Sequence, residues 1–305
     1  MAGSAPTARV VDIIELLARP GHRDLRFSDI VSELGATQAT THAILSTLSE
    51  RGWVGRDPAT KTYSLGPALA AVGLRAENAN PLLAAARTAA QRLHTETGFA
   101  TSVLERVDDS LIVAAHVSAD DSTPALGPGD RIPYAPPFGV ALAAWDSPAG
   151  RDIWLRRAAA DPELLARLEN VLQRTRDRGF DVDWTTPAMA QTAALVVTLQ
   201  RDGVPAQIAG IMDRLLVECT AVGSLSDDDP ARRAQPVATI AAPVIDDRGR
   251  ASLILAVHPL RRQSARQIQA VGRRVRAAAG SLSDRPTGDA AGEINYGAVR
   301  GSSAR

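Results

Sequence analysis

Apolar residues near the start of the chain recur with the period of an α-helix. Several follow the i, i+3, i+4, i+7 spacing that gathers apolar side chains on one helix face. These residues are Val10, Ile13, Ile14 and Leu17. The spacing predicts a helix over residues 9–18, which ends before Pro20 and Gly21 because proline cannot continue the helical hydrogen bonds. We expect the small and polar residues 1–7 to be disordered.

Two further helices and a pair of strands follow. Residues 28–34 and 38–51 carry apolar residues at helical spacing, and residues 35–37 between them match a helix-turn-helix connection. Residues 53–65 have strand character on both sides of a short polar turn. The pattern therefore predicts a winged helix-turn-helix domain over residues 8–66.

Candidate DNA contacts lie on the outer side of the third helix, on the wing and at the start of the second helix. Polar side chains there can exchange hydrogen bonds with base edges, and cations on the wing can lie along the phosphates. The candidates are Ser28, Gln38, Thr40, Thr41, His42, Arg56 and Lys61. The apolar stripes alone would suit any three-helix domain, but turn, third helix and wing together favour DNA binding.

The remaining pattern predicts a linker helix and an α+β domain. Residues 67–80 should link the first domain to a second one over residues 81–282. Strand signals occur in two pairs, each joined by a short polar turn and flanked by helices. The predicted strands are residues 100–107, 110–117, 237–245 and 251–257, and the flanking helices are residues 81–97 and 264–279. Residues 181–191 look irregular, residues 193–200 fit a helix or a strand, and residues 283–305 should be a disordered tail.

Short motifs recur in a fixed order over about residues 8–280. In the first domain they are residues 11–17, Gly35 with residues 40–48, and residues 51–54 and 57–66. In the second they are residues 129–133, residues 178–180, and residues 240–244 with Gly249. The series resembles the IclR family of bacterial transcription regulators. The resemblance implies a GAF-like effector-binding domain with a six-stranded antiparallel sheet and helices, and a homodimer or dimer of dimers on double-stranded operator DNA.

The same resemblance implies a pocket for a small organic effector, often a carboxylate, closed by the loop around Arg131. The candidate effector-binding residues are Arg131, Tyr134, Phe138, Thr239, Ala256 and His258. Tyr134 and Phe138 make the lid aromatic, which would suit an aromatic or larger apolar acid. Thr239 and a protonated His258 could hold the charge of that acid. The alternative places Tyr134 and Phe138 in the core and makes His258 a buried, hydrogen-bonded histidine.

The first domain departs from the family pattern at the start of the third helix. Where the family usually has a basic residue, a serine and an arginine after the histidine, this chain has Gln38, Ala39 and Ala43. Between residues 1 and 77, eight arginine and lysine residues balance eight aspartate and glutamate residues. A neutral domain predicts weak nonspecific binding and a shallow salt dependence. A small-molecule sensor with much reduced DNA binding is therefore an alternative function.

Composition limits the other classes of protein. The 305-residue chain has a formal net charge of zero and one cysteine, Cys219, which leaves no disulfide framework and no cysteine-based zinc site. No secretory segment precedes the first helix, and no apolar run approaches the ~20 residues that cross a bilayer. We expect a cytoplasmic protein without membrane association, metal or cofactor. The five histidines lack HExxH spacing, and neither GxSxG nor a glycine-rich phosphate loop occurs, so we do not expect an enzyme.

Overall fold

The structure is a computed structural model that describes residues 4–19, 24–118, 127–158, 162–186, 188–190, 192, 233–246 and 249–283. The chain divides into two compact units, Met1–Asn80 and Pro81–Arg305. Each unit has a hydrophobic core of its own. The boundary falls at Asn80, where the following proline disfavours the helical conformation.

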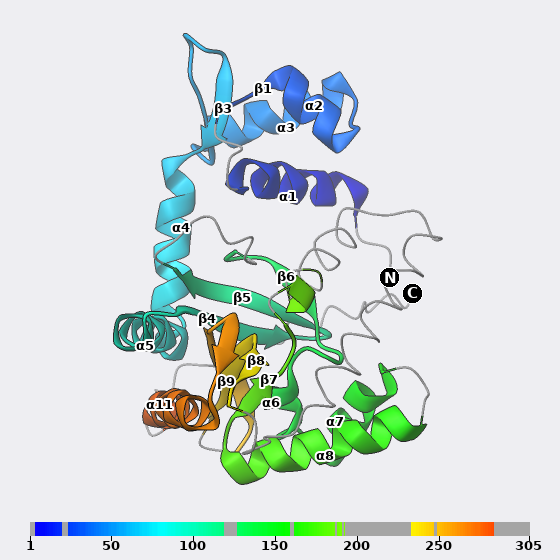
Figure 1. Ribbon diagram of the computed structural model, residues 1–305. Helices are drawn as coiled ribbons and strands as arrows, with labels where there is room; N and C mark the ends of the chain where they lie inside the picture. Colours follow the sequence, from blue (N-terminus) through cyan, green and yellow to red (C-terminus); the bar gives the residue numbers. More distant parts are fainter. Residues whose placement is uncertain are drawn as a thin grey trace. The chain divides into compact units, whose positions relative to one another are not determined.

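The first unit packs three helices against a small sheet (Figure 1). Its helices are α1 (Ala5–Ala18), α2 (Phe27–Leu34) and α3 (Gln38–Glu50). The antiparallel strands are β1 (Leu25–Arg26), β3 (Thr62–Leu65) and β2 (Val54–Arg56), in that order. The buried core consists of Ile13, Leu16, Leu17, Ile30, Leu45, Leu48, Val54 and Tyr63. The predicted winged helix-turn-helix is confirmed, with β1 as an added strand too short to leave a sequence pattern.

Helix α1 begins earlier than its apolar pattern indicates. It starts at Ala5, so the expected disorder of residues 1–7 is wrong for residues 5–7. Pro6 lies in the first helical turn, where a proline gives up no intrahelical hydrogen bond. Pro20, Gly21 and His22 lie outside the described residues.

The turn between α2 and α3 has the geometry that its sequence predicts. Gly35 ends α2 with a φ of 57°, a left-handed conformation that glycine adopts without a steric penalty. Thr37 caps α3, because its Oγ1 accepts a hydrogen bond from the Thr40 N–H at 3.2 Å. At the wing tip, the Asp57 carboxylate accepts hydrogen bonds from the N–H groups of Ala59 and Thr60 at 2.7 and 3.3 Å. These bonds close the predicted turn and lower the pKa of Asp57.

Helix α4 (Pro67–Asn78) coincides with the predicted linker helix. None of its described side chains is buried within the chain. Val72 is 47% exposed and Leu74 is 61% exposed. This helix therefore carries apolar side chains that the other described residues of the first unit do not cover.

The second unit is built on a six-stranded antiparallel sheet (Figure 1). Its strands in spatial order are β6 (Arg131–Pro133), β5 (Ser110–Val117), β4 (Ala100–Val107), β10 (Ala251–His258), β9 (Thr239–Ile245) and β7 (Asp181–Asp183). A separate pair is formed by β8 (Gln235–Val237) and β11 (Arg261–Gln263). The predicted α+β class and six-stranded sheet are confirmed.

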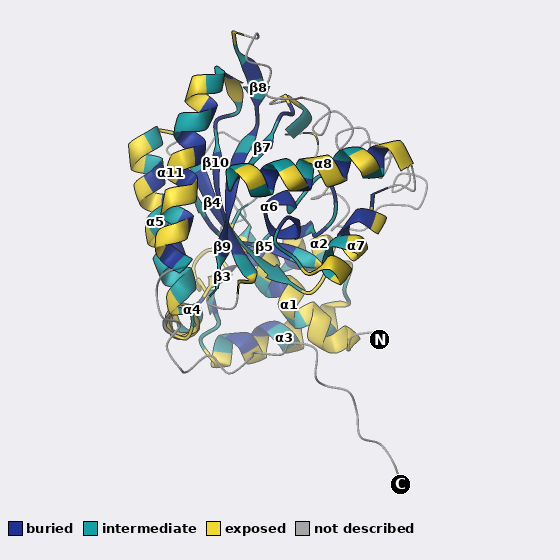
Figure 2. Ribbon diagram, turned by 90° about the horizontal axis from the view of Figure 1, so that it is seen from below, coloured by how far each residue is buried: buried dark blue, intermediate teal, exposed yellow. Residues whose placement is uncertain are grey.

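Helices cover both faces of this sheet (Figure 2). One face packs against α5 (Pro81–Thr97) and α11 (Ala265–Ser283), and the other against α6 (Val140–Ala143), α7 (Pro148–Arg156) and α8 (Pro162–Arg178). Side chains alternate between the faces along each strand. In β10, Leu255 and Val257 belong to the α5/α11 core, whereas Ile254 and Ala256 belong to the α6–α8 core.

Most predicted elements of the second unit are found within a few residues. Helix α5 and strands β4 and β5 have the predicted bounds, and α11 extends four residues further than predicted. Ser264 and Gln267 form a reciprocal cap at the start of α11. Residues 181–183 form strand β7, so the irregular structure expected over residues 181–191 is wrong there. Residues 193–200, Cys219 and the tail from residue 284 lie outside the described residues.

Candidate functional site

The outer side of α3 carries uncharged polar side chains in its first two turns. Gln38 and His42 are exposed, and Thr40 is half-buried. The Thr40 hydroxyl lies 2.9 Å from that of Thr37, so it also supports the cap of the helix. The His42 ring meets the Phe27 ring edge to face, with centroids 6.3 Å apart, which fixes the imidazole against α2. Gln38, Thr40 and His42 therefore form one polar surface on a packed helix.

Thr41 does not belong to this surface, and its prediction as a DNA contact is wrong. The residue is fully buried, and its hydroxyl donates to the Thr37 carbonyl at 3.1 Å. A step of one residue along a helix turns the side chain by about 100°, which moves Thr41 to the side of the core. The polar side chain of Thr41 did not indicate its burial, because its hydroxyl forms a hydrogen bond with the main chain of the same helix end.

The wing carries two cations in different settings. The Arg56 guanidinium carbon lies 5.7 Å from the centroid of the Tyr63 ring, so the cation is held over an aromatic face. Lys61 is exposed at the turn and has a φ of 59°. Neither forms an ion pair among the residues that the structure describes. Both charges are therefore free to meet a phosphate backbone.

The start of α2 is less suited to a phosphate than Ser28 alone suggests. Ser28 is exposed, but its hydroxyl donates to the carboxylate of Asp29 at 3.3 Å. That carboxylate also accepts a hydrogen bond from the Arg26 N–H at 2.9 Å. An anion already occupies the helix end where a phosphate would bind.

On the sheet of the second unit, two predicted effector-binding residues meet a third that sequence reasoning missed. The imidazole of His258 lies between two hydroxyls, with Nδ1 3.0 Å from Thr239 Oγ1 and Nε2 2.8 Å from Ser102 Oγ. Ser102 stands opposite His116 in the register of β4 and β5, and the rings of His116 and His258 are 6.3 Å apart. Ser102 comes from a strand 156 residues away, so no local pattern could indicate this contact.

His258 is a neutral group in this setting. Burial and the nearby His116 lower its pKa to about 4. At neutral pH its ring therefore donates one hydrogen bond and accepts the other. Desolvation disfavours the charged imidazole, so the protonated His258 expected to hold an anionic effector is disfavoured in this setting.

Two carboxyl groups lie on the same face of the sheet, at its edge. Asp183 stands opposite Thr239 and Asp181 opposite Ala241 in the register of β7 and β9. Burial raises the pKa of Asp183, and burial also raises the pKa of Asp181 to about 6, with Asp183 as a further cause. The face from His116 to Asp183 thus offers hydroxyls, neutral imidazoles and carboxyl groups.

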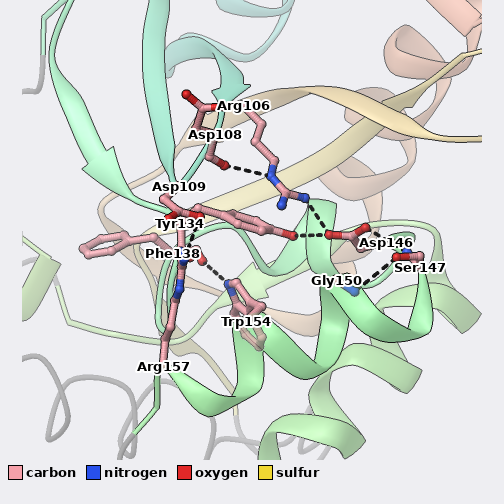
Figure 3. Close-up of polar contacts among 10 residues, drawn as sticks. All are labelled: Arg106, Asp108, Asp109, Tyr134, Phe138, Asp146, Ser147, Gly150, Trp154 and Arg157. Atoms are coloured by element: carbon pink, nitrogen blue, oxygen red, sulfur yellow. Dashed lines mark hydrogen bonds and ion pairs between the residues drawn. The ribbon is translucent and has the colours of Figure 1, made fainter. Parts of the chain in front are cut away.

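Tyr134 and Phe138 belong to a separate cluster on the α6–α8 side (Figure 3). Tyr134 is buried, and the Arg106 guanidinium carbon lies 4.0 Å from its ring centroid. Its hydroxyl donates to Asp146 Oδ2 at 3.2 Å, and the same oxygen pairs with Arg106 Nη1 at 2.5 Å. Burial is the main cause that raises the pKa of the Tyr134 phenol. Tyr134 is therefore a core residue that anchors its loop, which agrees with the alternative that placed it in the core.

The rest of this cluster fixes the loop from the other side (Figure 3). Arg157 Nη1 donates to the Tyr134 carbonyl at 2.9 Å, and its Nη2 pairs with Asp109 Oδ1 at 2.5 Å. Trp154 Nε1 donates to the Phe138 carbonyl at 2.9 Å, and Phe138 itself is half-buried. Main-chain carbonyls of the predicted lid are thus bound by side chains of α7 and the residue after it.

The two remaining candidates differ in their position. Arg131 is exposed on the edge strand β6. Ala256 is buried in the α6–α8 core and stands opposite Ser102 in the register of β10 and β4, so it lies on the same sheet face as His258. The six predicted effector residues therefore divide between the sheet face, the loop cluster and the sheet edge. Among the described residues, no cluster of three or more metal-ligating side chains occurs, and no helix is long and apolar enough to cross a membrane.

A winged helix-turn-helix with an exposed polar third helix, followed by an α+β sensor-like unit, defines the class of two-domain DNA-binding transcription regulators. The model of the IclR helix-turn-helix domain matches residues 6–58. The glycerol operon regulatory protein of Streptomyces coelicolor is 32% identical over 222 residues, which cover 69% of this chain and 86% of that protein. Its namesake from Streptomyces griseus is 32% identical over 216 residues, covering 68% and 85%. The chain belongs to the IclR family of transcription regulators.

Solved structures show the same fold. An IclR transcriptional regulator from Alicyclobacillus acidocaldarius has a TM-score of 0.60 at 20% identity and covers 92% of this chain and 98% of its own. An IclR homolog from Microbacterium hydrocarbonoxydans, complexed with 4-hydroxybenzoate, has a TM-score of 0.59 at 17% identity with the same coverage. At these identities the likeness concerns the fold alone.

Proposed function

We propose that this regulator is a homodimer that binds operator DNA with α3 and the wing of each subunit. The observation that carries the proposal is the polar surface of Gln38, Thr40 and His42 on a helix whose opposite side buries Leu45 and Leu48. Amide, hydroxyl and imidazole groups can hydrogen-bond to base edges in the major groove. Arg56 and Lys61 would contact the phosphates on either side of the wing.

Dimerisation is supported by the apolar side chains of α4. Val72 and Leu74 stay exposed within the described part of the first unit, and burying them against a second copy would remove apolar surface from water. A dimer would present two copies of α3 to two half-sites of a palindromic operator. A regulator of this kind acts in the cytoplasm, where the chromosome is.

We infer that the second unit binds a small organic effector on the sheet face around Thr239, His258 and Ser102. Because the imidazole is neutral, this face supports hydrogen bonding to polar, uncharged groups better than it supports a carboxylate. The Streptomyces relatives are named for a glycerol operon, which fits a small polar effector. Effector binding would regulate DNA binding only if the two states of the dimer bind it unequally.

A small-molecule sensor with reduced DNA binding is the second candidate. It is favoured by the neutral charge of the first domain and by Asp29, whose carboxylate lies at the start of α2. The two candidates differ in one measurable quantity, which is the affinity for a specific DNA site.

The test is selection of bound fragments from the source genome by the purified full chain at two salt concentrations, followed by sequencing. The regulator predicts enrichment of a short palindromic site at both concentrations. If no site is enriched at the lower or at the higher salt concentration, the result would contradict the regulator and favour the sensor.

A further inference from the structure

A cavity of about 300 Å³ lies at the far end of strand β9, away from Thr239 and His258. Strand β7 pairs only with residues 239–241, so among the described strands none pairs with that edge of β9 from Ala242 onward. The cavity opens beside this edge, where α8 from one face of the sheet and α11 from the other contribute to its wall. Figure 2 shows α8 and α11 on the two sides of the strands. The volume lies at the lower end of the range of small-molecule sites.

Two arginines line the cavity, and no described carboxylate pairs with either of them. Arg176 Nε donates to the Ala144 carbonyl, and Arg276 Nη1 donates to the Arg178 carbonyl at 3.2 Å. In the part of the chain that the structure describes, neither guanidinium forms an ion pair. Asp177 also lines the cavity, but its carboxylate accepts a hydrogen bond from Gln173 Nε2 at 2.9 Å. Main-chain carbonyls thus hold both cations, and the cavity wall carries two guanidinium groups and the carboxylate of Asp177.

The remaining walls suit a flat apolar body. Trp145 contributes an aromatic side chain, and Pro243 and Ile245 contribute an apolar strand edge. Gly280 of α11 lines the cavity, and a Cβ at that position would meet no atom within 4 Å, so a larger side chain there would enter open space. A guanidinium forms paired hydrogen bonds with a carboxylate, and an aromatic body can stack on Trp145.

We propose that this cavity binds a small aromatic carboxylate, with the carboxylate between Arg176 and Arg276 and the ring against Trp145 and Pro243. The site is distinct from the sheet face that carries the neutral His258, because that face lies at the opposite end of β9. It would give the second unit an additional ligand site that joins α8 to α11. The proposal does not depend on DNA binding or on the effector of the sheet face.

The experiment measures benzoate binding to the full-length protein by titration calorimetry, with benzyl alcohol as the neutral probe. Benzoate should bind and benzyl alcohol should bind at least about tenfold more weakly, because a hydrogen-bonded charge is lost. Arg276→Gln should weaken benzoate binding about tenfold or more. Arg273→Gln, which removes an exposed charge from the same helix outside the cavity, should leave it unchanged.

A second variant fills the cavity and keeps both charges. Gly280→Leu should abolish benzoate binding without loss of helix stability, since leucine favours a helix more than glycine does. Thr239→Val, at the sheet face, should leave benzoate binding intact. Equal binding in Arg276→Gln, Gly280→Leu and the native protein would overturn the proposal. Loss of binding only in Thr239→Val would also overturn it and would place the anion on the sheet face.

Discussion

The recognition surface on α3 and the polar sheet face around His258 are built in opposite ways. Gln38 and His42 are exposed side chains of one helix, and the core beneath them does not depend on their chemistry. His258 lies among buried and half-buried groups from several strands, and desolvation lowers its pKa. Substitutions on α3 should therefore change binding and leave folding alone, whereas substitutions around the sheet should change both.

The largest effect is expected on the α3 side. Thr40→Ala combined with His42→Ala should weaken specific operator binding by about 2–4 kcal/mol, or roughly 30- to 1000-fold, if each side chain makes one base contact. The unfolding free energy should fall by only about 1 kcal/mol, through the contact of Thr40 with the helix cap. Operator titrations and urea unfolding of the same samples measure both quantities.

A core substitution in the same helix serves as the control. Leu45→Ala should cost about 2–5 kcal/mol of stability, because it leaves a cavity beneath α3. Native operator affinity in the double variant would mean that α3 does not contact the bases.

The next largest effect is a pH dependence of the unfolding free energy, caused by the titration of His258. Its pKa is about 4 in the folded protein and 6.5 in the unfolded chain, so the unfolded chain takes up a proton first as the pH falls. The stability that the neutral His258 contributes to the folded protein is full above about pH 6.5 and is lost as the pH falls toward 4. The raised pKa of Asp181, about 6, acts in the opposite direction, because protonation relieves its burial as the pH falls below 6.

The variant His258→Gln isolates the histidine from this background, since glutamine keeps a donor and an acceptor but does not titrate. From pH 7 to pH 5 the native protein should lose about 2 kcal/mol more than the variant. Urea unfolding at the two pH values measures the difference. Equal losses in both proteins would show that His258 keeps an ordinary pKa.

A smaller effect is expected in the loop cluster. Tyr134→Phe removes the hydroxyl that donates to Asp146 and keeps the ring beneath Arg106, at a cost of about 1–2 kcal/mol to the second unit. Tyr63→Phe in the first unit is a matched control, because no described residue hydrogen-bonds to its hydroxyl. Thermal unfolding monitored separately for each unit compares the two. If Tyr134→Phe loses as little stability as Tyr63→Phe, the hydroxyl of Tyr134 does not anchor the loop.

The smallest effect concerns the wing. Arg56→Ala and Lys61→Ala should each flatten the slope of log affinity against log salt by about one, because each loses one phosphate contact. Arg9→Ala removes an exposed charge from α1 and should leave the slope unchanged. Operator binding at four salt concentrations measures the slopes, and an unchanged slope in both wing variants would place the wing off the DNA.

Much of the fold followed from local signals. Helix α5 ends at Thr97, because Gly98 accepts a left-handed conformation, and β4 and β5 turn at Asp108, which has a φ of 52°. The turn at residues 35–37 and the capped start of α11 follow equally from neighbouring residues. The family was also evident in the sequence, since its motifs occur in order along most of the chain.

The sequence determined where most helices and strands begin and end, because periodicity, caps and turns act over a few residues. Only the tertiary structure decided which polar side chains are available. Thr41 and Tyr134 are polar residues that the fold buries, whereas Ser102 becomes a partner of His258 across the sheet. Burial and long-range pairing depend on how distant strands and helices pack, and they set both the exposure and the charge state of a side chain.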